Sequence, residues 1–177
     1  ALAPIGGEDF VFFLNGQEHA TSRASHPLCR ADVIGPWYPA VLPGLQAFLR
    51  DEVATLLAAG GPVDLLTTIR RLTFRAFGHL EVGDSLDAHF DDFMTVAAKG
   101  HARLSNPLTK KLPLGGAFQQ AKARWLAALA EQVVAGRGDP QRVDLSATFS
   151  RLCPHIPVDR MAQDMSNVHY GGVFSTS

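Results

Sequence analysis

The sequence is poor in charge and in long apolar runs, and each shortage argues against a class of protein. Charged residues make up 19% of the 177 residues, and the formal net charge is −1. No run of five basic residues occurs, so nucleic acid is not the expected partner. No apolar run reaches the roughly 18 residues that a membrane-spanning helix needs. We therefore expect no membrane span and no nucleic-acid partner, and the low charge suggests a surface buried against something else.

Cysteine is also scarce, and no targeting segment is recognisable. Cys29 and Cys153 share no metal-ligand spacing, and two cysteines are too few for a disulfide scaffold. The chain opens without a signal-peptide pattern, so we expect a cytoplasmic protein. Because the first residue is not methionine, we also expect the natural N-terminus to lie upstream.

What the sequence does contain is helical periodicity. Apolar residues make up 46% of the chain, enough for the core of one domain, and no β-alternation lasts long enough to form a sheet. We expect one mainly α region over residues 1–177 without an internal boundary. Predicted helices cover residues 18–30, 41–60, 64–78, 84–97, 118–136, 144–152 and the segment from 158 onward, with a loop over 101–116.

The spacing of apolar residues predicts which helix faces are buried. In the first half of the chain these residues are Val41, Leu45, Phe48, Leu49, Val53, Leu56, Leu65, Ile69, Leu72 and Ala76. In the second half they are Leu86, Phe90, Phe93, Met94, Ala97, Phe118, Ala121, Trp125, Leu129, Val133, Val158, Met161, Met165, Val168 and Gly172. Asp64 is the expected N-cap of the third helix, and Asp84 or Ser85 of the fourth.

His19 and Arg23 form the first candidate binding site. They are four residues apart on one predicted helix, so their side chains lie on the same face and can hold one anion together. An arginine fork suits a carboxylate, and such charge-assisted contacts contribute about 1.5–3 kcal/mol each when shielded from water. The alternative is a solvated helix face.

Two other polar clusters favour a structural reading. His26 and Cys29 lie next to Pro27 without an obvious third ligand, which argues against a metal site. Asp87 and Asp91 are expected on one helix face, with His89 pointing elsewhere. We expect a solvated acidic face there, and no metal ligand in the chain.

The last predicted helix contains a weakened segment. Gly171 and Gly172 each cost a helix about 1 kcal/mol relative to alanine, so a close approach of another group is one reason for them. Ser175 and Thr176 follow, and their hydroxyls can bond the carbonyl four residues back or a ligand. The alternative is a helix that packs closely on a neighbour at its small residues.

Taken in order, these motifs resemble the cytochromes P-450, the haem-thiolate monooxygenases. Gly16-Gln-Glu-His19-x-x-x-Arg23 is similar to the start of that family's helix C, and Leu72-Thr-Phe-Arg-Ala-Phe-Gly78 to its helix E, which commonly ends in Phe-Gly. The loop over 101–116 matches the loop at the substrate entrance. Tyr170-Gly-Gly-Val-Phe-Ser-Thr176 falls at the oxygen-binding groove of helix I, usually Ala-Gly-x-acid-Thr-Thr. The resemblance covers helices C to I, an incomplete domain.

The resemblance implies roles for particular residues. His19 and Arg23 would hold the propionates of haem b, and Gly171 and Gly172 would shape the oxygen groove. Ser175 or Thr176 would be the catalytic hydroxyl. Phe12, Phe13 and Phe174 would line the pocket of an apolar small-molecule substrate. The electrons would come from a ferredoxin or a flavoprotein.

Two departures from the family pattern limit this assignment. Phe174 stands at the usual acidic position, and phenylalanine cannot carry a proton. The family's Glu-x-x-Arg motif and its glycine-rich cysteine loop do not occur, so we expect the axial cysteine beyond Ser177 and an inactive fragment. Two alternatives remain: a peroxide-using or dehydrating haem enzyme of the same fold, and a non-enzymatic all-α ligand-binding or dimerising domain.

Overall fold

In a computed structural model, the described residues form helices joined by short turns and contain no strand. The structure describes residues 17, 20, 31–105 and 114–176. The elements are α3 (Ala31–Ala59), α4 (Leu65–Val82), the 3-10 helix η3 (Asp87–His89), α5 (Phe90–Ser105), α6 (Gly116–Gly138), α7 (Leu145–Leu152) and α8 (Val158–Thr176). The expected mainly α class is confirmed. Within these ranges, no helix combines the length and the apolar character that crossing a membrane requires.

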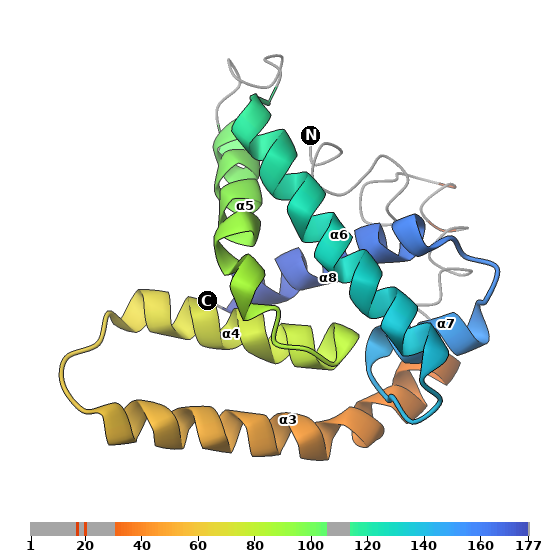
Figure 1. The fold of residues 1–177 in the computed structure, drawn as a ribbon, viewed down its shortest axis with the longest axis horizontal. Helices are drawn as coiled ribbons and strands as arrows, with labels where there is room; N and C mark the ends of the chain where they lie inside the picture. The colour runs from red at the N-terminus through yellow and green to blue at the C-terminus, as the bar shows by residue number, and fades with distance from the viewer. Residues whose placement is uncertain (1–16, 18–19, 21–30, 106–113, 177) are drawn as a thin grey trace.

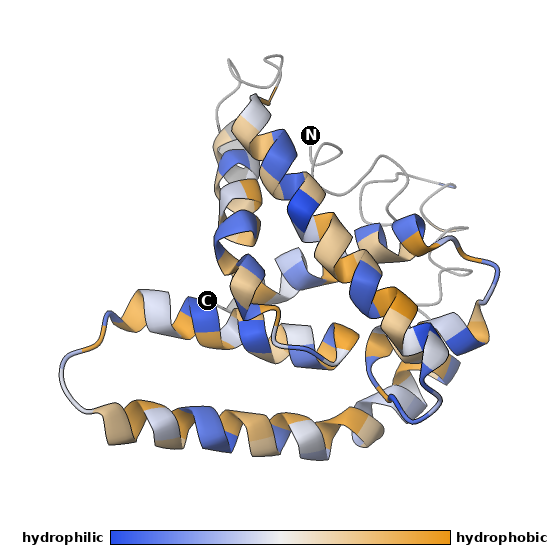
Figure 2. Cartoon of the chain, viewed as in Figure 1, coloured by the Kyte–Doolittle hydropathy of each residue, from blue (hydrophilic) through white to orange (hydrophobic). Residues whose placement is uncertain are grey.

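Two antiparallel helix pairs, one crossing helix and the short helix α7 make up the described architecture (Figure 1). α3 and α4 run side by side, and α5 packs against α6. α8 passes behind α6 in this view and contacts both α6 and α4. The main core lies where these helices meet, and its buried residues are Phe74, Val82, Leu86, Phe90, Phe93, Trp125, Ala128, Leu129, Leu145, Ala162, Met165 and Val173. Apolar and polar residues alternate around each helix, as one-sided burial requires (Figure 2).

Aspartate side chains cap the starts of two helices, and the cap at Asp64 is the one that the sequence predicts. Asp64 accepts hydrogen bonds from the backbone N–H groups of Leu66 and Thr67, at 3.1 and 3.3 Å. Asp144 does the same at the start of α7, accepting from the Ala147 N–H at 3.0 Å. Each cap satisfies N–H groups that have no partner within the first helical turn.

The inward faces predicted for the fourth and fifth helices are also confirmed. The residues that are less than a tenth exposed are Leu86, Phe90, Phe93, Ala97, Phe118, Ala121, Trp125, Leu129 and Val133. Met94 is half-buried against the same core. In the last helix, Met161 and Met165 are fully buried, as expected.

The start of α3 differs from the prediction. The helix begins at Ala31, ten residues before the expected start, and it contains Pro36, Pro39 and Pro43. Proline normally interrupts a helix because it lacks an N–H group and its ring strikes the preceding turn. Here Val33 is fully buried, so tertiary packing offsets the poor helix propensity of this segment. The helix predicted over 18–30 lies almost entirely outside the described residues.

Several side chains predicted to face the core are exposed instead. Val53 is 45% exposed and Leu65 is 65% exposed, and Leu56 and Ile69 are also on the surface. They lie toward the turn between α3 and α4, where the helix pair extends beyond the rest of the bundle (Figure 1). Helical spacing identifies an apolar face, but it does not show whether another element covers that face.

The end of α4 also lies beyond its predicted position. The helix continues past Gly78 to Val82 and ends at Gly83, whose φ of 68° is the left-handed conformation that favours glycine. Gly78 lies inside the helix, and the backbone of Asp84 and Ser85 crosses directly over it, so this position has no room for a side chain. A Cβ at this position would overlap the Asp84 carbonyl oxygen. The glycine therefore marks a close backbone crossing rather than a helix end.

The connection from α4 to α5 is more elaborate than one capped helix. Asp84 accepts a hydrogen bond from the Leu86 N–H at 2.7 Å, and the 3-10 helix follows before α5 begins at Phe90. The predicted capping role of Asp84 or Ser85 on the next α-helix is therefore wrong, because the carboxylate stabilises a turn. α5 reaches Ser105, beyond the expected start of the loop at residue 101.

Candidate functional site

The second half of α8 carries the glycines assigned to an oxygen groove, and their surroundings differ. A Cβ on Gly172 would overlap the ring of Phe77 on α4, so this glycine lies at a helix crossing. Gly171 is exposed, and no described atom outside its own helix turn lies within 4 Å of the place where its Cβ would be. Phe174 is half-buried, with its ring centroid 6.0 Å from that of Phe93 on α5. Among the described residues, only the Gly171 side of the pair leaves room for another group.

Alanine substitutions at the two glycines should therefore have opposite effects. We expect Gly172→Ala to lower the free energy of unfolding by about 1–2 kcal/mol, because overpacking against Phe77 exceeds the gain in helix propensity. Gly171→Ala should raise it by up to about 1 kcal/mol, since only the propensity term applies. Urea unfolding followed by far-UV circular dichroism measures both values. Phe77→Leu should restore part of the stability of Gly172→Ala, and equal stabilities for the two alanine variants would contradict this packing.

The remaining residues of the predicted site are not described in enough detail to place their side chains. Ser175 and Thr176 lie in the last turn of α8, and the structure describes only their backbone, which is helical. His19, Arg23 and the aromatic pair Phe12 and Phe13 lie outside the described residues, as do His26 and Cys29. Their assigned roles therefore remain predictions.

A buried histidine–glutamate pair joins α8 to α4, and sequence reasoning missed it. His169 Nδ1 lies 2.8 Å from Glu81 Oε2, and the two side chains are 0% and 1% exposed. The ring centroids of Phe74, Phe93 and Trp125 lie 4.6, 5.0 and 5.1 Å from that of the histidine. His169 follows Met165 by four residues, so its place on the apolar stripe of the last helix was the available sequence signal.

Burial changes the protonation of both partners. It raises the pKa of Glu81 well above its usual value of 4.5, and it lowers the pKa of His169 from 6.5 to about 3. Both pKa shifts have the same cause, because burial among aromatic rings disfavours a charge on either side chain. The preferred state is therefore a protonated Glu81 that donates its hydrogen bond to the neutral His169 ring.

The acidic segment after α4 is largely paired with arginines. Asp87 lies in η3, not on the same α-helix as Asp91, so the predicted shared face is wrong. It accepts two hydrogen bonds from Arg71, at 2.8 and 2.9 Å, and Asp92 is similarly paired with Arg124. Within the described part of the chain, no three histidine, cysteine or acidic side chains gather as metal ligands.

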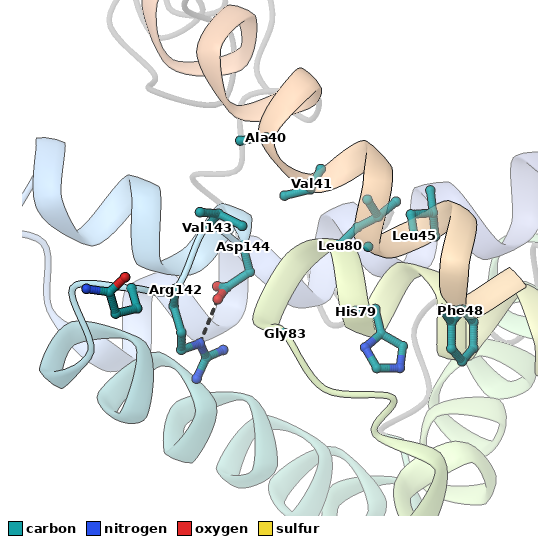
Figure 3. Close-up of a pocket in the computed structure, with 12 residues that line it drawn as sticks. Ala40, Val41, Leu45, Phe48, His79, Leu80, Gly83, Arg142, Val143 and Asp144 are labelled. Carbon is teal, nitrogen blue, oxygen red and sulfur yellow. Dashed lines mark hydrogen bonds and ion pairs between the residues drawn. The ribbon is translucent and has the colours of Figure 1, made fainter. Parts of the chain in front are cut away.

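A cleft of about 430 Å³ lies between α3, the end of α4 and the turn before α7 (Figure 3). Its lining residues are Ala40, Val41, Gly44, Leu45, Phe48, His79, Leu80, Gly83, Gln141, Arg142, Val143 and Asp144. This volume lies within the range of ligand pockets, roughly 300–1,000 Å³. None of its lining residues comes from α8, so the cleft is separate from the groove predicted there.

Comparison with known proteins adds no family assignment. No protein-family model matches the chain, and neither a curated protein nor a solved structure shows significant similarity to it.

Proposed function

We propose that this chain is part of a haem-dependent cytochrome P-450 monooxygenase, which oxidises an apolar small molecule with O₂ and electrons from a redox partner. The proposal rests on the ordered motifs of the sequence, and the mainly α fold is compatible with it. A long helix, α8, carries the groove motif, and it packs on both α4 and α6 at the centre of the described bundle.

The observation that carries the proposal is the open side of α8 at Gly171. Gly172 is covered by Phe77, but Gly171 exposes helix backbone on a different side, about one turn before Ser175. A flat cofactor or a small ligand needs such a place, where no side chain keeps it away from the helix. These residues fit a haem in part, because Gly171 leaves space and the hydroxyl groups of Ser175 and Thr176 can offer hydrogen bonds.

Each remaining residue then has a distinct task. Haem, when bound, would supply the oxidising iron centre. His19 and Arg23 would hold the propionates by charge-assisted hydrogen bonds. Ser175 or Thr176 would donate a hydrogen bond and pass a proton within the groove. The aromatic residues Phe12, Phe13 and Phe174 would line the substrate pocket.

A peroxide-using haem enzyme of the same fold is the second candidate, and Phe174 favours it. This side chain stands where the family usually has an acid, and its ring lies 5.0 Å from that of Tyr170 and 6.0 Å from that of Phe93. The phenyl ring of Phe174 cannot itself carry a proton as the usual acid does. Turnover of one substrate with O₂ and a reductant, compared with turnover with peroxide, distinguishes the two enzymes.

Haem retention tests the proposal directly. In the longest natural protein that contains this chain, we expect His19→Ala combined with Arg23→Ala to lower the haem content of the purified protein several-fold, because each charge-assisted contact contributes about 1.5–3 kcal/mol. The pyridine haemochromogen assay measures haem per protein. His155→Ala combined with Lys99→Ala removes one histidine and one cation from exposed positions and is the matched control.

Two results would contradict the proposal at different levels. An unchanged haem content in the His19/Arg23 double variant would remove only the propionate assignment. A wild-type protein that folds cooperatively and takes up no haem would instead support the non-enzymatic ligand-binding alternative.

A further inference from the structure

The cleft between α3 and α4 has one apolar wall. Val41, Leu45 and Phe48 project from successive turns of α3, and Leu80 of α4 continues the same surface (Figure 3). Gly44 leaves a gap in this wall, because no described atom outside its own helix turn lies within 4 Å of the place where its Cβ would be. A flat apolar group therefore has both a surface to cover and space to enter.

His79 provides the polar group on this wall. Its ring centroid lies 4.3 Å from that of Phe48, and the side chain is half-buried. No described residue forms a hydrogen bond with either of its ring nitrogens. Burial lowers the pKa of His79 below its usual 6.5, so the ring is neutral at pH 7 and offers one donor and one acceptor. A half-buried histidine without hydrogen bonds has capacity for a ligand.

The opposite wall carries charges that are already neutralised. Arg142 donates from its Nε atom to Asp144 at 2.7 Å, and its terminal nitrogens donate to the carbonyl oxygens of Val82 and Gln132. Asp144 is 3% exposed and also accepts from the N–H of Ala147. Neither side chain has a free charge to offer, so an ionic ligand would lose water in the cleft without gaining a counter-ion.

We propose that this cleft binds a small uncharged aromatic molecule that carries a hydroxyl group. The ring lies against the apolar wall formed by Val41, Leu45 and Phe48, and the hydroxyl forms a hydrogen bond with His79. The apolar wall and the neutralised opposite wall offer no counter-charge, so the cleft excludes anions such as phosphates and, for the same reason, ammonium compounds. This second site does not depend on haem, because no residue of α8 lines it.

A fluorescence titration with 1-naphthol, and with naphthalene as its counterpart without a hydroxyl, tests the proposal. We expect wild type to bind one equivalent of 1-naphthol, and to bind it about tenfold more tightly than naphthalene, as one hydrogen bond implies. Gly44→Leu fills the gap and should weaken the binding of both probes more than tenfold. Ala47→Leu is the matched control, since this position on α3 is exposed and does not line the cleft. Added haem should not change the affinity.

His79→Phe provides an independent readout that keeps the cleft apolar. In this variant the tenfold preference for 1-naphthol over naphthalene should disappear, while the affinity for naphthalene is retained. This ratio decides the question even if Gly44→Leu does not fold, which far-UV circular dichroism would reveal. The proposal is overturned if wild type does not bind 1-naphthol, if a folded Gly44→Leu binds it as tightly as wild type, or if His79→Phe keeps the preference.

Discussion

Glu81→Gln should make the protein more stable than wild type above pH 6.5, while Glu81→Ala should lose about 3–5 kcal/mol at about pH 5.5. The amide has the shape of a protonated carboxyl group and can donate the same hydrogen bond to His169 Nδ1. Alanine leaves a cavity and a buried histidine without its partner. The two substitutions therefore separate the hydrogen bond from the proton that the native pair must hold.

The pH dependence follows from the protons carried by the pair. Between pH 4.5 and 6.5 the unfolded chain holds one proton on His169, and the folded pair holds one on Glu81, so their contributions cancel. Above pH 6.5 the unfolded chain loses its proton while the folded pair keeps it, so stability falls as the pH rises toward the raised pKa of Glu81. Below pH 4.5 the unfolded chain takes up a second proton, and stability falls as the pH falls toward 3.

Urea unfolding at several pH values measures this effect. The advantage of Glu81→Gln over wild type should grow by up to about 1.4 kcal/mol per pH unit above pH 4.5, because His169 contributes equally to both proteins and only the proton on Glu81 differs. Parallel profiles for wild type and Glu81→Gln in this range would show that the folded pair does not retain its proton. In that case the aromatic surrounding tolerates an ionised Glu81.

Gly78→Ala should be the most damaging alanine substitution at a described helical glycine. The added methyl group would strike the backbone of Asp84 and Ser85, with the Ser85 carbonyl oxygen at 3.0 Å, and backbone cannot rotate away as a side chain can. Overpacking costs about 3 kcal/mol, and the better helix propensity of alanine offsets about 1 kcal/mol of it. We expect a net loss of about 2 kcal/mol in the free energy of unfolding, measured by thermal or urea unfolding.

Gly44→Ala on α3 is the control for this substitution. No described atom outside its own helix turn lies within 4 Å of its Cβ position, so only the gain in propensity applies and stability should rise by about 1 kcal/mol. A Gly78→Ala protein as stable as Gly44→Ala would mean that the turn after α4 does not cross the helix this closely. Changed NMR signals of His79 and Glu81, which lie one and three residues after Gly78, would show how far the damage spreads.

The candidate sites were predictable only in part. The motif of α8 directs attention to Gly171 and Gly172, but it does not tell which glycine meets a protein side chain. Gly172 is the glycine that meets a side chain, that of Phe77, and Phe77 lies on a helix almost a hundred residues earlier in the chain. The cleft at His79 had no sequence signal, because its walls come from three separate segments. Long-range packing brings such residues together, and local spacing carries no information about it.

The sequence by itself determined where most helices lie and which faces of α5, α6 and α8 are apolar. Caps such as Asp64 and Asp144 act on the next three residues, and helical spacing is equally local, so both can be read from the chain. Only the tertiary structure decided that Val53 and Leu65 stay exposed, that Gly78 lies inside α4, and that His169 meets Glu81. The physical reason is that burial depends on which other element covers a face. In this chain, α8 supplies that cover for α4, and no described element supplies it at the α3–α4 turn.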